Sequence, residues 1–96
     1  MLFEQLQQQK SEIESLAQSY GAFGIQVFGS VARHEDKPDS DIDFLVDFPV
    51  GYNLFTQRLP LTKKLEELTG RKIDLIPIHE LNKHIRSAVM QEATYL

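Results

Sequence analysis

The sequence predicts an α/β fold in which helices flank a small β-sheet of three or more strands. Helical segments, with apolar residues three or four positions apart, alternate with three short segments whose apolar residues occupy every second position. Glycine or proline lies at most boundaries between them. The predicted order is helix–strand–helix–strand–helix–strand–helix. A chain of 96 residues supplies one hydrophobic core, so we expect a single domain over residues 1–96.

The first helix is predicted from one apolar face, formed by Leu2, Leu6, Ile13, Leu16 and Tyr20. Gly21 and Gly24 are expected to end it, because glycine favours helix termini. Residues 24–28 then alternate, with Ile25 and Val27 on one side, and indicate a short strand.

A turn and a second strand follow. Ser30 is expected to cap a short helix over residues 31–35, and residues 36–40 have the composition of a loop. Residues 41–48 form the clearest strand pattern. Its two faces carry Ile42, Phe44 and Val46 on one side and Asp41, Asp43, Leu45 and Asp47 on the other.

The C-terminal half repeats the alternation. A helical region over residues 53–69 contains Pro60, which predicts a kink or a new helix with Pro60 in its first turn, and Gly70 ends it. Residues 72–76 indicate a third strand, and residues 80–93 a last helix. Its inward-facing residues are expected to be Leu81, Ile85, Ala88 and Val89.

Composition excludes several classes of protein. The net charge is −4 and the ten Lys and Arg residues are scattered, which argues against binding long nucleic acids. The chain has no Cys, so disulfides and thiolate metal sites are impossible. No apolar run approaches membrane-spanning length, and the N-terminus lacks the apolar core of a signal peptide. We therefore expect a soluble, cytoplasmic protein.

The aspartates of the second strand predict a metal site. Asp41 and Asp43 are two positions apart, so their carboxylates leave the same face of the strand and repel each other unless a cation lies between them. Carboxylate oxygens suit Mg²⁺. Asp74 in the third strand would join them if that strand lies beside the second. Three carboxylates can hold two metal ions roughly 3.5–4 Å apart, an arrangement used for attack at phosphorus.

The turn before this strand predicts a phosphate site. Gly29 allows a phosphate to approach the backbone closely, and the Ser30 hydroxyl adds a donor. Arg33, one helical turn later, is placed to reach a phosphate oxygen, although at such a position an arginine is as often a plain surface charge.

These motifs resemble a known family. Gly29-Ser30, ten further residues and then Asp41-x-Asp43 are similar to the signature of the DNA polymerase beta-like nucleotidyltransferases. The strings Gly-Ser-Val-Ala-Arg and Pro-Asp-Ser-Asp-Ile-Asp-Phe-Leu-Val resemble its smallest branch, the minimal nucleotidyltransferases that accompany a HEPN-domain partner. The resemblance covers nearly the whole chain.

The resemblance implies a mixed sheet with the Asp41-x-Asp43 strand at its centre. It implies that Asp41, Asp43 and Asp74 are catalytic and bind Mg²⁺, and that Gly29 and Ser30 hold the triphosphate. In the HEPN/MNT toxin–antitoxin branch the nucleotidyltransferase is the antitoxin. It is similar to enzymes that transfer AMP from ATP to a tyrosine of a HEPN ribonuclease, so we expect ATP, two Mg²⁺ ions and a hetero-oligomer with that toxin. His34 departs from the glycine of many relatives, which affects the geometry of the following loop.

Other interpretations are weaker or stay open. Asp39, Asp41 and Asp43 match the start of a calcium loop, but its required glycine and glutamate are Phe44 and Val50. No Gly-Lys-Ser/Thr of a P-loop is present. Asp47 is expected to be solvated. Two functional alternatives remain: an antitoxin that blocks its toxin by contact alone, and a transferase acting on a small molecule or a nucleic-acid end.

Overall fold

The computed structural model describes residues 2–96. The elements, in chain order, are α1 (Leu2–Gln8), α2 (Lys10–Ser19), β1 (Phe23–Phe28), α3 (Gly29–Ala32), β2 (Ile42–Asp47), the π-helical turn η1 (Leu54–Arg58), α4 (Leu59–Thr69), β3 (Ile73–Pro77), the 3-10 turn η2 (Ile78–Glu80) and α5 (Lys83–Glu92). The predicted strands are all present, with ends shifted by one residue, as is usual for element boundaries.

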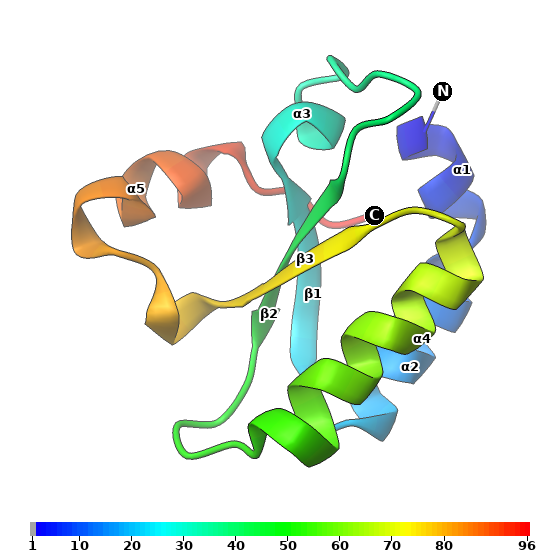
Figure 1. Ribbon diagram of the computed structural model, residues 1–96. Helices are drawn as coiled ribbons and strands as arrows, with labels where there is room; N and C mark the ends of the chain where they lie inside the picture. Colours follow the sequence, from blue (N-terminus) through cyan, green and yellow to red (C-terminus); the bar gives the residue numbers. More distant parts are fainter. Residues whose placement is uncertain (1) are drawn as a thin grey trace.

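The sheet has the order β1-β2-β3. β1 is antiparallel to β2, whereas β2 and β3 are parallel, so β2 is the central strand of a mixed sheet (Figure 1). The C-terminal segment adds to the free edge of β1, where Val27 and Thr94 exchange two backbone hydrogen bonds of 2.9 Å. The predicted α/β fold and the central place of the double-aspartate strand are confirmed.

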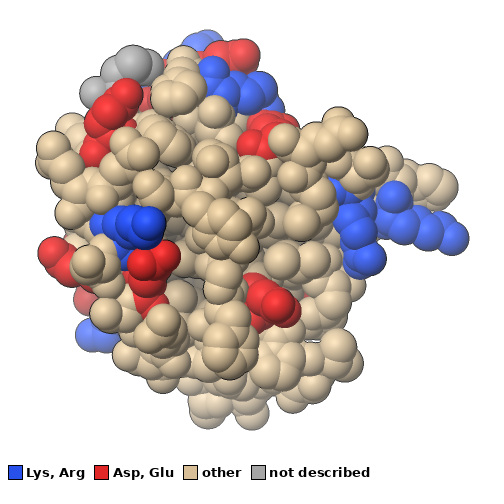
Figure 2. All heavy atoms as spheres, turned by 180° about the vertical axis from the view of Figure 1, so that it is seen from behind, with Lys and Arg blue, Asp and Glu red and all other residues tan. Residues whose placement is uncertain are grey.

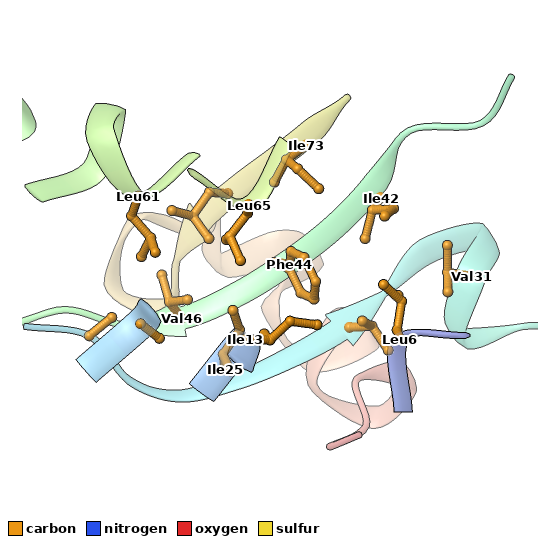
Figure 3. Packing of buried hydrophobic residues seen from close by; sticks show 14 of the residues in the cluster. Leu6, Ile13, Ile25, Val31, Ile42, Phe44, Val46, Leu61, Leu65 and Ile73 are labelled. Carbon is orange, nitrogen blue, oxygen red and sulfur yellow. The ribbon is translucent and has the colours of Figure 1, made fainter. Parts of the chain in front are cut away.

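One face of the sheet packs against α1, α2 and α4 and forms the hydrophobic core. The β2 residues predicted to share a face, Ile42, Phe44 and Val46, are fully buried there. Figure 3 shows Phe44 between the sheet and side chains such as Ile13 and Leu65, which the helices supply. Removing a buried aromatic ring of this kind typically costs about 3–5 kcal/mol, so this layer holds the sheet in place.

The N-terminal helix is divided, where the sequence predicted one continuous helix. α1 ends at Gln8 and α2 starts at Lys10. The side chain of Gln9, between them, donates a hydrogen bond of 3.1 Å to the carbonyl of Leu68 at the end of α4. The break lets both short helices bury their apolar residues against the sheet, Leu2 and Leu6 from α1 and Ile13 and Ala17 from α2.

Pro60 begins a new helix, which was one of the two predicted outcomes. The π-helical turn η1 runs into α4, and Pro60 lies in the first turn of α4, where a missing N–H costs nothing. Asn53 Oδ1 caps η1 by accepting from the amides of Phe55 and Thr56, both at 2.9 Å. Gly70 ends α4 in the left-handed conformation, as predicted.

The prediction for the last helix is partly wrong. Leu81 is buried, but it lies before the helix, which begins at Lys83 after the Asn82 cap. Ile85 is 51% exposed and Ala88 is also exposed; Val89 is only partly buried. None of residues 83–92, all of them described, is buried, because α5 lies to one side of the sheet rather than across it (Figure 1). Among residues 2–96, the helices are all too short or too polar to span a bilayer.

Candidate active site

Gly29 lies directly against a carboxylate. It follows Phe28, which pairs with Asp43 across β1 and β2. Its φ is +72°, a conformation that favours glycine, and a Cβ built on Gly29 would overlap Asp43 Oδ2. The Asp43 carboxylate therefore occupies the space in which any other residue would place its Cβ, and only glycine allows this close approach.

The helix after this turn differs from its prediction. α3 covers Gly29–Ala32 rather than residues 31–35, so Ser30 is its second residue and not its cap. The helix starts early because Gly29 makes the sharp turn itself and needs no capping side chain before it. Ser30 is partly buried beside Gly29, and Val31 is fully buried.

Asp74 joins Asp43, as the sequence predicted for neighbouring strands. The parallel register of β2 and β3 places the two residues directly opposite each other. Asp43 is half-buried and Asp74 is exposed. Burial, and after it the charge of the Asp74 carboxylate, raise the pKa of Asp43 to about 6. Two carboxylates held this close give a locally negative site that attracts a cation.

Asp41 lies one residue before β2 and is partly buried. Its charge reaches Asp43 and adds to the rise in pKa there. Among residues 2–96, however, no three His, Cys, Asp or Glu side chains converge closely enough to hold a metal ion together. The arrangement is thus an Asp43–Asp74 pair with Asp41 beside it. Asp47, at the far end of β2, is exposed as expected.

Arg33 is paired with acidic side chains. Its Nη1 lies 2.5 Å from Glu92 Oε1 at the end of α5, and its Nε lies 3.4 Å from Glu35 Oε2. Glu92 also contributes to the raised pKa of Asp43, so it belongs to the surroundings of the site. No sequence pattern points to Glu92, because it is 49 residues from Asp43 and follows no motif.

Arg71 is a second residue near the site to which no sequence motif points. Its Nη1 donates to the carbonyls of Lys37, Pro38 and Ser40 at 3.3, 2.6 and 3.1 Å. These carbonyls belong to the loop that leads into Asp41. Arg71 therefore fixes the path of the chain just before the acidic strand, and no local sequence pattern reveals this contact.

His34 has a backbone conformation that favours glycine. Its φ is +58°, the left-handed region in which most residues are disfavoured. The imidazole ring lies 5.1 Å from the Phe3 ring, centroid to centroid, and this contact helps to hold the conformation.

A groove of about 350 Å³ opens beside the aspartate pair. It lies between the sheet and α5, and most of its walls are apolar. The lining residues are Phe28, Asp43, Asp74, Ile76, Glu80, Leu81, Asn82, Ile85 and Val89. The space is large enough for an aromatic ring, and the two carboxylates lie at its side. On the face in Figure 2 the Lys and Arg side chains form separate groups rather than a continuous basic surface.

Comparisons with known proteins identify the family of the chain. The family model described as nucleotidyltransferase domain matches residues 6–96. Protein adenylyltransferase MntA of Thermococcus cleftensis is 37% identical over 83 residues, 86% of this chain and 83% of the relative. A protein of Methanocaldococcus jannaschii assigned to the protein adenylyltransferases is 32% identical over 84 residues, 88% and 89% of the two chains.

Two solved structures are similar. One, presented as a minimal nucleotidyltransferase, has a TM-score of 0.87 and 38% identity, and the match covers 100% of this chain and 97% of the other. A toxin–antitoxin crystal structure with AMP-PNP has a TM-score of 0.75, and the match covers 88% and 69%. At 21% identity this second likeness concerns the fold alone.

Proposed function

The chain belongs to the nucleotidyltransferase domain family and is a nucleotidyltransferase; on that premise we propose that it transfers AMP from ATP to a tyrosine of a HEPN ribonuclease toxin and so acts as its antitoxin. The observation that supports this most is the position of Gly29 against Asp43, with Asp74 opposite in the next strand. It puts the backbone of the Gly29-Ser30 turn, the proposed phosphate-binding segment, next to a pair of carboxylates. The similar MntA protein is a protein adenylyltransferase by name.

The donor set fits Mg²⁺. Asp43 and Asp74 offer hard carboxylate oxygens, and their mutual repulsion is what a bound cation would relieve. Mg²⁺ typically takes one or two protein carboxylates and completes its shell with water and substrate phosphates, so a preformed cage of three is not required. We propose Asp43, Asp74 and Asp41 as the residues that hold it. When bound, the ion would neutralise charge that develops on the phosphates.

The chain's own residues bind and orient the nucleotide. The proposed phosphate contacts are the backbone of Gly29, which has no side chain to hinder the approach, and the Ser30 hydroxyl, which adds a donor. Arg33 lies on the same turn and offers a guanidinium, which suits phosphate geometry. The acceptor oxygen then forms a bond to the α-phosphorus, and the bond from that phosphorus to the bridging oxygen breaks. Pyrophosphate leaves, and the hydroxyl proton passes to the exposed carboxylate of Asp74.

The groove supports an aromatic acceptor. Its apolar walls, which include Ile76, Leu81 and Ile85, suit a phenol ring and favour it over a strongly hydrated acceptor. A tyrosine that enters between α5 and the sheet would bring its hydroxyl to the side where Asp74 lies. The toxin partner is expected to supply the rest of the acceptor surface.

The test uses the purified chain, the small helical protein encoded by the neighbouring gene, Mg²⁺ and α-labelled ATP. We expect label on a tyrosine of that protein, dependent on Mg²⁺, together with loss of its ribonuclease activity. The Asp41→Asn/Asp43→Asn variant should bind the toxin without labelling it. Label on a small molecule or a nucleic-acid end would replace the proposed acceptor. Neutralisation that survives the double substitution would replace catalysis with simple binding.

A further inference from the structure

The Arg33–Glu92 ion pair connects two parts of the site. Arg33 follows the Gly29-Ser30 turn, and Glu92 is the last residue of α5. The 2.5 Å contact is closer than the 3.4 Å contact of Arg33 with Glu35, and Glu92 is the less exposed of the two acids, at 25% against 63%. Glu92 is therefore the main partner of this guanidinium.

The position of Glu92 is set by the backbone around it. Two residues later, Thr94 pairs with Val27 of β1 through two hydrogen bonds of 2.9 Å. Ala93 closes the end of α5 with a bond of 2.8 Å from its amide to the Val89 carbonyl. These contacts fix the end of α5 next to α3. Glu92 is thus held where its carboxylate acts on both Arg33 and Asp43.

We propose that Glu92 is a positioning residue that competes with the phosphates of the nucleotide for the Arg33 guanidinium and thereby sets the affinity for ATP. This rests on the proposed function, in which Arg33 contacts phosphate. In the nucleotide-free protein Glu92 neutralises Arg33 and holds it in place. In the complex the guanidinium exchanges one carboxylate for a phosphate, which suits its planar donors equally well.

This exchange is opposed by the charge of the Glu92 carboxylate. Once Arg33 turns to phosphate, the Glu92 carboxylate stays near Asp43 and the nucleotide without its partner. Its negative charge then disfavours the bound state and favours release of nucleotide or pyrophosphate. Removing that charge should tighten nucleotide binding, whereas the reacting atoms, which Glu92 does not touch, should be unaffected.

The test measures ATP affinity by titration calorimetry, and transfer kinetics, in the 96-residue chain. Glu92→Gln should tighten ATP binding and lower its KM by about two- to fivefold, the range for one exposed ion pair, with kcat changed less than KM. Glu92→Asp, which keeps the charge, should resemble the wild type. Glu67→Gln is the matched control for net charge, because Glu67 pairs with Lys64 on α4, away from the site, and should change nothing.

A double-mutant cycle with Arg33→Gln separates the explanations. If Glu92 acts through Arg33, the gain from Glu92→Gln should largely disappear when Arg33 is Gln. An equal gain in both backgrounds would overturn the proposal in favour of general repulsion. Weaker ATP binding together with a lower melting temperature in Glu92→Gln would overturn it in favour of a structural role. If the wild type does not bind ATP at all, the proposed function fails instead.

Discussion

Asp43 lies directly opposite Asp74 across the parallel pair of β2 and β3. This register puts two carboxylates on the same side of adjacent strands, next to the Gly29 turn. The fold thus keeps two negative charges close together at a site that is partly screened from water. Such an arrangement lowers the stability of the folded protein until a cation binds. The charge of the Asp43 carboxylate should therefore have a measurable effect on the free energy of unfolding.

Asp43→Asn should stabilise the protein at neutral pH and abolish transfer. The folded state raises the pKa of Asp43 from 3.8 to about 6, so folding favours the protonated form and stability falls as pH rises through about 6. Converted fully, this change in pKa corresponds to about 3 kcal/mol of unfolding free energy. Because the carboxylate is only half-buried, screening by solvent reduces the expected effect to about 1–2 kcal/mol. Chemical denaturation should show this gain at pH above about 7 and little or none below about 4.

Two measurements accompany this variant. Mg²⁺ should raise the melting temperature of the wild type but not of Asp43→Asn, because binding to the folded state alone stabilises it. Asp47→Asn, at the exposed far end of the same strand, should leave stability unchanged at every pH. A wild type more stable than Asp43→Asn at neutral pH without metal would show that the two carboxylates do not repel each other.

Gly29→Ala should destabilise the protein by about 2–4 kcal/mol and eliminate transfer, because it adds backbone strain and a collision with Asp43 Oδ2. Gly51→Ala is the matched control: its φ is +88°, but none of the described atoms lies within 4 Å of its Cβ, so only strain of about 1 kcal/mol is expected. Thermal unfolding compares the two. Equal losses of stability in the two variants would mean that a Cβ at position 29 does not collide with the Asp43 carboxylate.

Arg71→Lys should loosen the loop before Asp41. Arg71 Nη1 donates to three carbonyls there, and the lysine side chain is shorter and lacks the rigid planar group that holds this nitrogen among them. We expect a loss of about 1–2 kcal/mol and faster amide hydrogen exchange at residues 36–41. Lys72→Ala, at an exposed neighbouring position, is the control. Unchanged exchange in Arg71→Lys would show that the loop holds its path without this residue.

Ile85→Ser should leave stability within about 0.5 kcal/mol of the wild type, because Ile85 is half exposed on α5. By contrast, Leu65→Ala, in the core of α4, should cost about 2–5 kcal/mol. Since Ile85 lines the groove beside the aspartates, Ile85→Ser should weaken transfer to a tyrosine acceptor by raising the KM for the partner. A large loss of stability would place α5 in the core, as the sequence pattern predicted.

Local features of the sequence determined much of this protein. Alternation along residues 41–48 placed Asp41 and Asp43 on one face of a strand, and the Gly29-Ser30 turn next to it predicts a place for phosphate. Both depend on residues close together in the chain, whose relative positions are set by backbone periodicity. The break at Pro60 and the end of α4 at Gly70 were predictable for the same reason.

Only the tertiary structure decided which distant residues meet. Asp74 lies beside Asp43 because β3 pairs in parallel with β2, and alternation within a strand does not specify its neighbour. Arg71 and Glu92 reach the site through contacts between elements that no local pattern connects. The apolar spacing of residues 80–93 predicted a buried helix face. It could not reveal that α5 lies to one side of the sheet, where none of its described residues is buried. Periodicity states which side chains share a face; the fold decides what that face contacts.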